Sequence, residues 1–126
     1  MLENGATTIW ERFELKKSFN MNSHNHPMYG AIGYWFYSYI AGVKPIAKGW
    51  SEFCVKPYFP KQLKYAQALV DSACGKISVK WIKQYGFIDV YVSVPFGAKC
   101  HIELPGIKEI KGSGNYIYHI KNSQED

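Results

Sequence analysis

The spacing of apolar positions changes once along this chain. In the first part, apolar residues recur every three or four positions between Met28 and Ala41, which predicts one apolar α-helix. Pro27 is tolerated in the first turn of a helix, Gly42 suits a C-terminal cap, and Pro45 prevents continuation. One apolar face, of a kind that packs as core, is expected from Ile32, Trp35, Phe36, Tyr39 and Ile40.

After the helix the apolar period becomes two, which is typical of half-buried strands. The pattern predicts strands at residues 50–55, 63–71, 76–83, 87–94, 99–104 and 116–121, and a further strand at 107–111 that could form a hairpin with the last one. The predicted inward side chains are Ile77, Val79, Trp81, Ile88, Val90, Val92, Val94, Cys100, Ile102 and Leu104. Short strands separated by Gly and Pro turns indicate a mainly β fold, an antiparallel β-sandwich preceded by a loop and one apolar α-helix. Residues 1–21 are expected to be irregular, and residues 122–126 a disordered polar tail.

Charge and composition exclude several classes of partner. The net charge of +5 raises the question of nucleic acid, but Arg12 is the only arginine, so we expect no nucleic-acid partner and assign the lysines to solvated strand faces. The apolar run at 29–43 is shorter than the about 20 residues that a membrane helix needs, so no membrane partner is expected. Cys54, Cys74 and Cys100 form no CxxC pair, which argues against a disulfide framework or zinc site, and no metal or other cofactor is expected.

The candidate chemistry lies before the helix. Glu11 follows Trp10, and His24 and His26 lie in a short polar segment just before the helix. A carboxylate can activate water, an aromatic ring can stack on the C–H face of a pyranose, and an imidazole can hydrogen-bond sugar hydroxyls. By residue type alone, structural roles for all four side chains stay open.

The sequences of three short segments are more specific than these residue types. Residues 7–12 (TTIWER), 21–26 (MNSHNH) and 30–37 (GAIGYWFY) resemble the end of the catalytic domain of bacterial α-L-rhamnosidases, family 78 of the glycoside hydrolases. Residues 41–43 and 74–81 resemble the region after the catalytic domain in that family. The resemblance implies an inverting enzyme with an (α/α)6 barrel and a C-terminal β-sandwich. Residues 1–43 would then be the C-terminal end of the barrel, and residues 44–126 the sandwich domain.

The resemblance also implies roles for single residues. Glu11 matches the proposed general base, His26 matches a histidine at the rhamnose subsite, and Trp10 matches the subsite wall. Phe13 stands where a tryptophan is common, and His24 occupies a position that is often aromatic. These departures bear on the details of substrate recognition more than on the resemblance to the family.

The 126 residues are too few for a six-hairpin barrel, so the resemblance implies a fragment with the general base but without the general acid, expected to be inactive alone. Its expected partners are a rhamnosylated glycoside or polysaccharide, bound by the complete enzyme, and the missing N-terminal barrel. In this chain several apolar side chains of the helix would be exposed, which predicts a homodimer through residues 29–41. Met1 leads directly into the motif without a signal peptide, and the missing N-terminus leaves both a cytoplasmic and an exported location open.

Two further hypotheses concern the sandwich. It could be a non-catalytic carbohydrate-binding module, or a structural domain that braces the barrel. Tyr58, Phe59, Tyr65 and Trp81 could form a flat sugar-binding platform, although packing in the core is the preferred interpretation for them. His101 and His119 are isolated, and we expect them to face outward in solvated or hydrogen-bonded positions.

Overall fold

The structure is a computed structural model that describes residues 1–15 and 23–122, without the side chains of residues 28 and 29. The chain divides into two compact units, Met1–Trp35 and Phe36–Asp126, each of which is described by itself. Residues 1–15 contain one 3-10 helix, Leu2–Asn4, and are otherwise irregular, as expected. The rest of the expected irregular segment and the expected polar tail lie largely outside the described residues.

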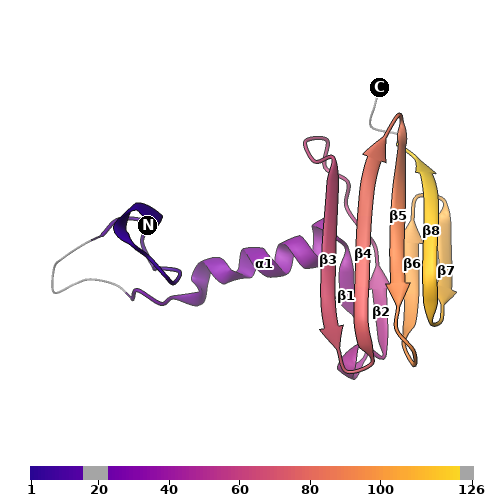
Figure 1. Cartoon of the computed structure of the whole chain (residues 1–126), viewed down its shortest axis with the longest axis horizontal. Coiled ribbons are helices and arrows are strands. Elements are labelled where there is room, and N and C mark those ends of the chain that lie inside the picture. The colour runs from indigo at the N-terminus through magenta and orange to yellow at the C-terminus, as the bar shows by residue number, and fades with distance from the viewer. Residues whose placement is uncertain (16–22, 123–126) are drawn as a thin grey trace. The chain divides into compact units, whose positions relative to one another are not determined.

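The second unit is a β-sandwich of two four-stranded sheets, which confirms the predicted fold class (Figure 1). One sheet has the order β1-β2-β6-β7 and the other β3-β4-β5-β8. The strands are β1 (Val43–Pro45), β2 (Glu52–Val55), β3 (Tyr65–Ser72), β4 (Gly75–Gln84), β5 (Phe87–Val94), β6 (Lys99–Leu104), β7 (Ile107–Lys111) and β8 (Gly114–Lys121).

The core lies between the inner faces of these sheets. All ten predicted inward side chains on β4, β5 and β6 are buried, and Phe53 on β2 is fully buried as well. Trp81 donates its indole N–H to the carbonyl oxygen of Ile40 at 2.8 Å, and Phe59 packs edge-on against its ring. Of the four residues of the suggested sugar platform, Phe59 and Trp81 are therefore core, whereas Tyr58 and Tyr65 are exposed.

The pairing of the strands differs from the prediction at three places. β2 and β6 run parallel, in a fold whose other strand pairs are antiparallel among the described residues. β7 pairs with β6 and β8 pairs with β5, so the suggested hairpin of β7 with β8 is wrong and the connection crosses between the sheets. The strand β1 was not predicted because it is short and ends in Pro45. An edge strand tolerates a proline since its outer side needs no ladder hydrogen bond.

The predicted helix is present as a helical run of three types. A 3-10 helix at Pro27–Gly30 leads into α1 (Ala31–Trp35), which continues as a π-helix at Phe36–Ile40. The N–H of Ala41 donates to the carbonyl of Phe36 at 3.0 Å, five residues back, which is the π-helical pattern. None of the described helices is long and apolar enough to cross a membrane.

The apolar face of this helical run is largely exposed. Only Ile40, near its end, joins the sandwich core, together with Ala41. The exposed members are Ile32, Tyr34, Trp35, Phe36, Tyr37 and Tyr39. The expectation that several of these side chains are exposed in this chain is confirmed, with Ile40 as the exception.

Gly42 ends the helical run, as predicted from its suitability as a cap. Its φ of 74° lies in the left-handed region, and a Cβ at this position would lie 2.1 Å from the nitrogen of Pro57. The carbonyl of Gly42 accepts the N–H of Lys56 at 2.8 Å. A side chain is therefore excluded both by the backbone conformation and by the close approach of the segment after β2.

Candidate active site

Two short segments of the first unit, residues 8–11 and 23–26, lie antiparallel, and we call this pair of segments the clasp. The N–H of Glu11 donates to the carbonyl of Ser23 at 3.0 Å, and the N–H of His26 donates to the carbonyl of Ile9 at 2.7 Å. The hydroxyl of Thr8 donates to the carbonyl of His24. These bonds fix the sequence motif around Glu11 against the polar segment that precedes the helix.

The carboxylate of Glu11 is held at one oxygen. The N–H of Ser23 donates to Oε2 of Glu11 at 3.1 Å, so Ser23 positions both the main chain and the side chain of this residue. Ser23 is itself fixed, because its hydroxyl donates to the carbonyl of Asn25 at 3.0 Å and accepts the N–H of Asn25 at 3.1 Å. Glu11 is half-buried. A carboxylate anchored at one oxygen keeps the lone pairs of the other for a water or a hydroxyl.

Trp10 precedes Glu11 in the chain and is buried, with 5% of its surface exposed. The ring of His24 stacks on the indole, with centroids 4.4 Å apart and planes 19° apart. The main-chain N–H of Trp10 is directed at the sulfur of Met1 at 3.3 Å. The imidazole therefore packs on the indole and helps to fix the orientation of this ring.

The clasp brings together Glu11, Trp10 and His24, and it places His26 through its main chain opposite Ile9. Sequence reasoning did not assign the positioning roles of Ser23, of His24 and of the hydroxyl of Thr8. The only available signal was their presence within the two motifs, because a spacing of residues does not show which main-chain group meets which side chain. No group of three metal-ligating side chains occurs among the residues that the structure describes.

The histidines of the sandwich face outward and are hydrogen-bonded, as predicted. Nε2 of His101 lies 3.2 Å from Oε2 of Glu52, and Nδ1 of His119 lies 2.5 Å from Oδ1 of Asp89. The ring of His119 also stacks on Phe87 with centroids 4.3 Å apart. These contacts give both histidines a structural explanation.

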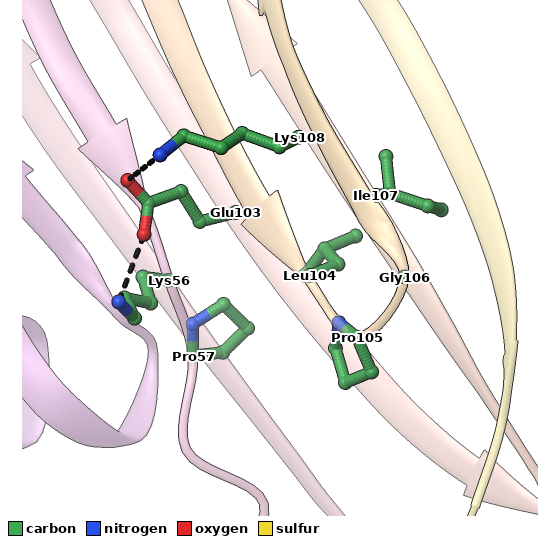
Figure 2. A pocket seen from close by; sticks show the side chains of 8 residues that line it. All are labelled: Lys56, Pro57, Glu103, Leu104, Pro105, Gly106, Ile107 and Lys108. Atoms are coloured by element: carbon green, nitrogen blue, oxygen red, sulfur yellow. Dashed lines mark hydrogen bonds and ion pairs between the residues drawn. The ribbon is translucent and has the colours of Figure 1, made fainter.

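The sandwich also carries a pocket of about 510 Å³ beside the turn between β6 and β7. Figure 2 shows Glu103 between two lysines there: Oε2 of Glu103 lies 2.8 Å from Nζ of Lys56, and Oε1 lies 4.0 Å from Nζ of Lys108. The hydrogen bond from Lys56 lowers the pKa of Glu103 and raises the pKa of Lys56. The rest of the lining is uncharged and consists of Pro57, Leu104, Pro105, Gly106 and Ile107. The charges compensate one another, so the pocket contains no carboxylate prepared to accept a proton.

Two family models match successive parts of the chain. The model of the bacterial alpha-L-rhamnosidase C-terminal domain matches residues 42–116, which is more than half of the chain. The chain belongs to the bacterial alpha-L-rhamnosidase family. The model of the bacterial alpha-L-rhamnosidase 6 hairpin glycosidase domain matches residues 1–40. In this rhamnosidase-family chain, the clasp therefore lies in the part matched by the glycosidase domain.

Individual rhamnosidases agree with the family models. An alpha-L-rhamnosidase of Alteromonas sp. (strain LOR) is 36% identical over 120 residues, which are 90% of this chain and 13% of that enzyme. The structure of the alpha-L-rhamnosidase of Dictyoglumus thermophilum matches 96% of this chain and 17% of its own, with 30% identity and a TM-score of 0.79. The alpha-L-rhamnosidase of Streptomyces avermitilis, solved in complex with L-rhamnose, matches 95% of this chain and 14% of its own, with 25% identity and a TM-score of 0.79. The chain thus spans a small part of the length of these relatives.

Proposed function

We propose that this chain forms the C-terminal part of an inverting α-L-rhamnosidase that hydrolyses terminal α-L-rhamnosyl residues, with Glu11 as the general base. The observation that carries the proposal is the anchoring of the Glu11 carboxylate at Oε2 by the N–H of Ser23. Both the main-chain N–H and the Oε2 atom of Glu11 are hydrogen-bonded to Ser23, which leaves Oε1 to accept a proton. Its position in the part matched by the 6 hairpin glycosidase domain supports a role in glycoside cleavage.

In this proposal Glu11 acts on one water molecule. The carboxylate takes a proton from the water as the water oxygen bonds to the anomeric carbon, on the face opposite the leaving group. A carboxylic acid donates a proton to the glycosidic oxygen as its bond to that carbon breaks. Inverting enzymes place the two carboxyl groups about 6.5–9.5 Å apart to leave room for the water. The acid belongs to another part of the longer protein, which is the reason why we expect the 126-residue chain to be inactive alone.

The neighbouring rings have binding roles in this proposal. Trp10 forms part of the wall of the rhamnose subsite, and since it is 5% exposed and His24 covers one face of its indole, it supports this wall from within. His26 hydrogen-bonds a sugar hydroxyl, and its main chain is fixed opposite Ile9 by a hydrogen bond of 2.7 Å. His24 positions Trp10 through the ring stack and does not itself contact the sugar.

The same proposal assigns the parts of the chain. Residues 1–43 complete the catalytic helical barrel, and residues 44–126 form the sandwich domain that comes after it. The partner of the first part is then the remainder of the barrel, and the substrate is a rhamnosylated glycoside or polysaccharide. The exposed aromatic side chains of the helical run support this assignment, because apolar surface of this kind is normally covered in a complete domain.

A chimaeric enzyme tests the role of Glu11. The segment of the Streptomyces avermitilis rhamnosidase that matches this chain is replaced by it, and hydrolysis of an aryl α-L-rhamnoside is measured. Glu11→Gln is expected to lower kcat by about 10²–10⁴-fold with little change in KM, because the amide cannot take a proton from water. His26→Ala is expected to raise KM more than it lowers kcat. NMR identifies the anomer of the sugar that is released first, which shows whether hydrolysis inverts the anomeric configuration.

Glu14→Gln is the matched control, since Glu14 is an exposed carboxylate three residues further along the chain. It is expected to leave kcat unchanged. A Glu11→Gln chimaera that retains most of its kcat would show that Glu11 is structural. Turnover by the isolated chain at the level of the chimaera, in a preparation free of contaminating glycosidase, would contradict the assignment of the acid to another part of the protein.

A further inference from the structure

The outer face of the β3-β4-β5-β8 sheet carries a small depression that the Glu11 site does not involve. Its volume is about 270 Å³. Ser78 on β4, Ser93 on β5 and Asn115 on β8 are successive cross-strand partners and form one row of this face. Tyr91 and Ile117, partners on β5 and β8, stand in the adjacent row and also line the depression. Figure 1 shows these three strands next to one another in the front layer.

The row of Ser78, Ser93 and Asn115 presents polar groups that are not used within the sheet. Among the described residues, the structure gives no side-chain hydrogen bond to any of the three. Two hydroxyls and a carboxamide, each of which can donate and accept hydrogen bonds, lie side by side at cross-strand spacing. Asn115 is exposed, and the two serines are partly so, which means that a ligand in the depression can reach these groups.

The adjacent row supplies apolar surface. Both residues lie on the outer face of the sheet, opposite the core, and Tyr91 is 37% exposed and Ile117 70% exposed. Lys80 is the one charged residue in the two rows, and it does not line the depression. The lining is therefore uncharged, with an aromatic ring and an aliphatic side chain on one side and hydroxyl and amide groups on the other.

We propose that this depression is a second carbohydrate site, a subsite for one neutral pyranose ring. A pyranose has an apolar C–H face that packs on an aromatic or aliphatic side chain, and hydroxyls that exchange hydrogen bonds with uncharged polar groups. The volume lies just below the range of pockets for drug-sized ligands, which suits one sugar ring. The site would hold a glycan chain on the sandwich while another residue of that glycan is cleaved elsewhere.

Two other pockets of the sandwich fit this ligand less well. The pocket in Figure 2 is lined by two lysines and a glutamate that are paired with one another, and it has no aromatic side chain. A groove of about 280 Å³ between Phe36 and Leu63 has a largely apolar lining with one amide side chain, Gln67. Of these three, the depression over Ser93 is the one that combines a ring with several unused hydrogen-bonding groups.

The test uses the whole 126-residue chain, labelled with ¹⁵N, and follows its amide signals during titration with methyl α-L-rhamnopyranoside. We expect saturable shifts centred on Ser78, Tyr91, Ser93 and Asn115. Tyr91→Ala is expected to weaken the apparent affinity by about fivefold, which corresponds to the loss of one aromatic packing contact. Ser93→Ala should weaken it less. Thermal unfolding of each variant shows that the sandwich is intact.

Tyr65→Ala is the matched control, because Tyr65 is an exposed tyrosine on β3, on the same outer face but outside the depression. It is expected to leave the affinity unchanged, and myo-inositol is expected to give no saturable shifts. Absence of saturation, or equal affinity of the Tyr91→Ala variant, would overturn the proposal. Shifts confined to Trp10 and Glu11 would also overturn it while supporting the first site, so the two proposals fail independently.

Discussion

The clasp and the sandwich are held together by different interactions. In the described part of the first unit, Trp10 is the one buried hydrophobic residue, and the clasp depends on hydrogen bonds that lie close to water. The sandwich buries a continuous core that includes Phe53, Val79, Trp81 and Ile102 completely. Exposed hydrogen bonds contribute little net stability, whereas burial of apolar surface is the dominant favourable term. The candidate site residues of the clasp thus lie in the unit that buries the least apolar surface.

The largest expected effect concerns stability. Trp81→Ala should lower the free energy of unfolding by about 4 kcal/mol, since it empties the centre of the sandwich and removes the donor to Ile40. Trp10→Ala should leave the main transition unchanged, because Trp10 belongs to the other unit. Urea unfolding followed by far-UV circular dichroism measures both. If the two variants lowered the midpoint equally, the sandwich would not be the independent unit described above.

The second prediction concerns the exposed helical run of residues 27–40. We expect the chain to self-associate at micromolar concentration through this run, and the double variant Trp35→Ser/Phe36→Ser to be monomeric, because several large apolar side chains are exposed there. Light scattering at several concentrations measures the mass. Phe96→Ser is the control, as Phe96 is an exposed aromatic in the turn between β5 and β6. A wild-type chain that stays monomeric would contradict the expectation.

The third prediction concerns the thiol of Cys100 in the sandwich core. Burial raises the pKa of Cys100 to about 12, from its ordinary value of 9.0. The folded state therefore keeps the neutral thiol, and the stability linked to it is complete below pH 9.0 and is lost as the pH rises above that value. At a pH one unit above this ordinary value the loss is on the order of 1 kcal/mol.

Urea unfolding at neutral and alkaline pH measures this loss. Cys100→Ala should show a smaller decline at alkaline pH than the wild type, whatever its stability at neutral pH. Cys74→Ala, which changes a half-buried thiol, serves as the comparison and should retain the decline. If stability declined equally at alkaline pH in Cys100→Ala and in the wild type, the decline would come from groups other than Cys100.

The smallest expected effect concerns an exposed ion pair. The pKa of Glu103 is lowered from 4.5, chiefly by its hydrogen bond with Lys56, so its contribution is present above that pH and is lost as the pH falls through the lowered value. Glu103→Gln should slightly reduce the loss of stability on acidification, and added salt should reduce the difference. Glu14→Gln, in the other unit, should leave the acid response of the sandwich unchanged. An acid response of Glu103→Gln identical to that of the wild type would show that the pair contributes nothing measurable.

The sequence by itself determined which residues face the core. Strict alternation predicted the bounds of β5 and β6 and the inward positions of Trp81 and Ile102, because side chains of a strand point to opposite faces with a period of two. It also gave the helical run, its end at Gly42, and the motif around Glu11. Each of these features depends on neighbours that are close in sequence.

Only the tertiary structure decided which segments meet. The pairing of Phe53 with Cys100 in the parallel β2–β6 pair joins residues far apart in the chain, and no local period specifies it. The hydrogen bond from Ser23 to Glu11 and the stack of His24 on Trp10 likewise link segments separated by more than ten residues. Periodicity reports the direction of a side chain, whereas partners are chosen by the packing of the whole fold. For that reason the residues of the candidate site were visible in the sequence, and the contacts that position them were not.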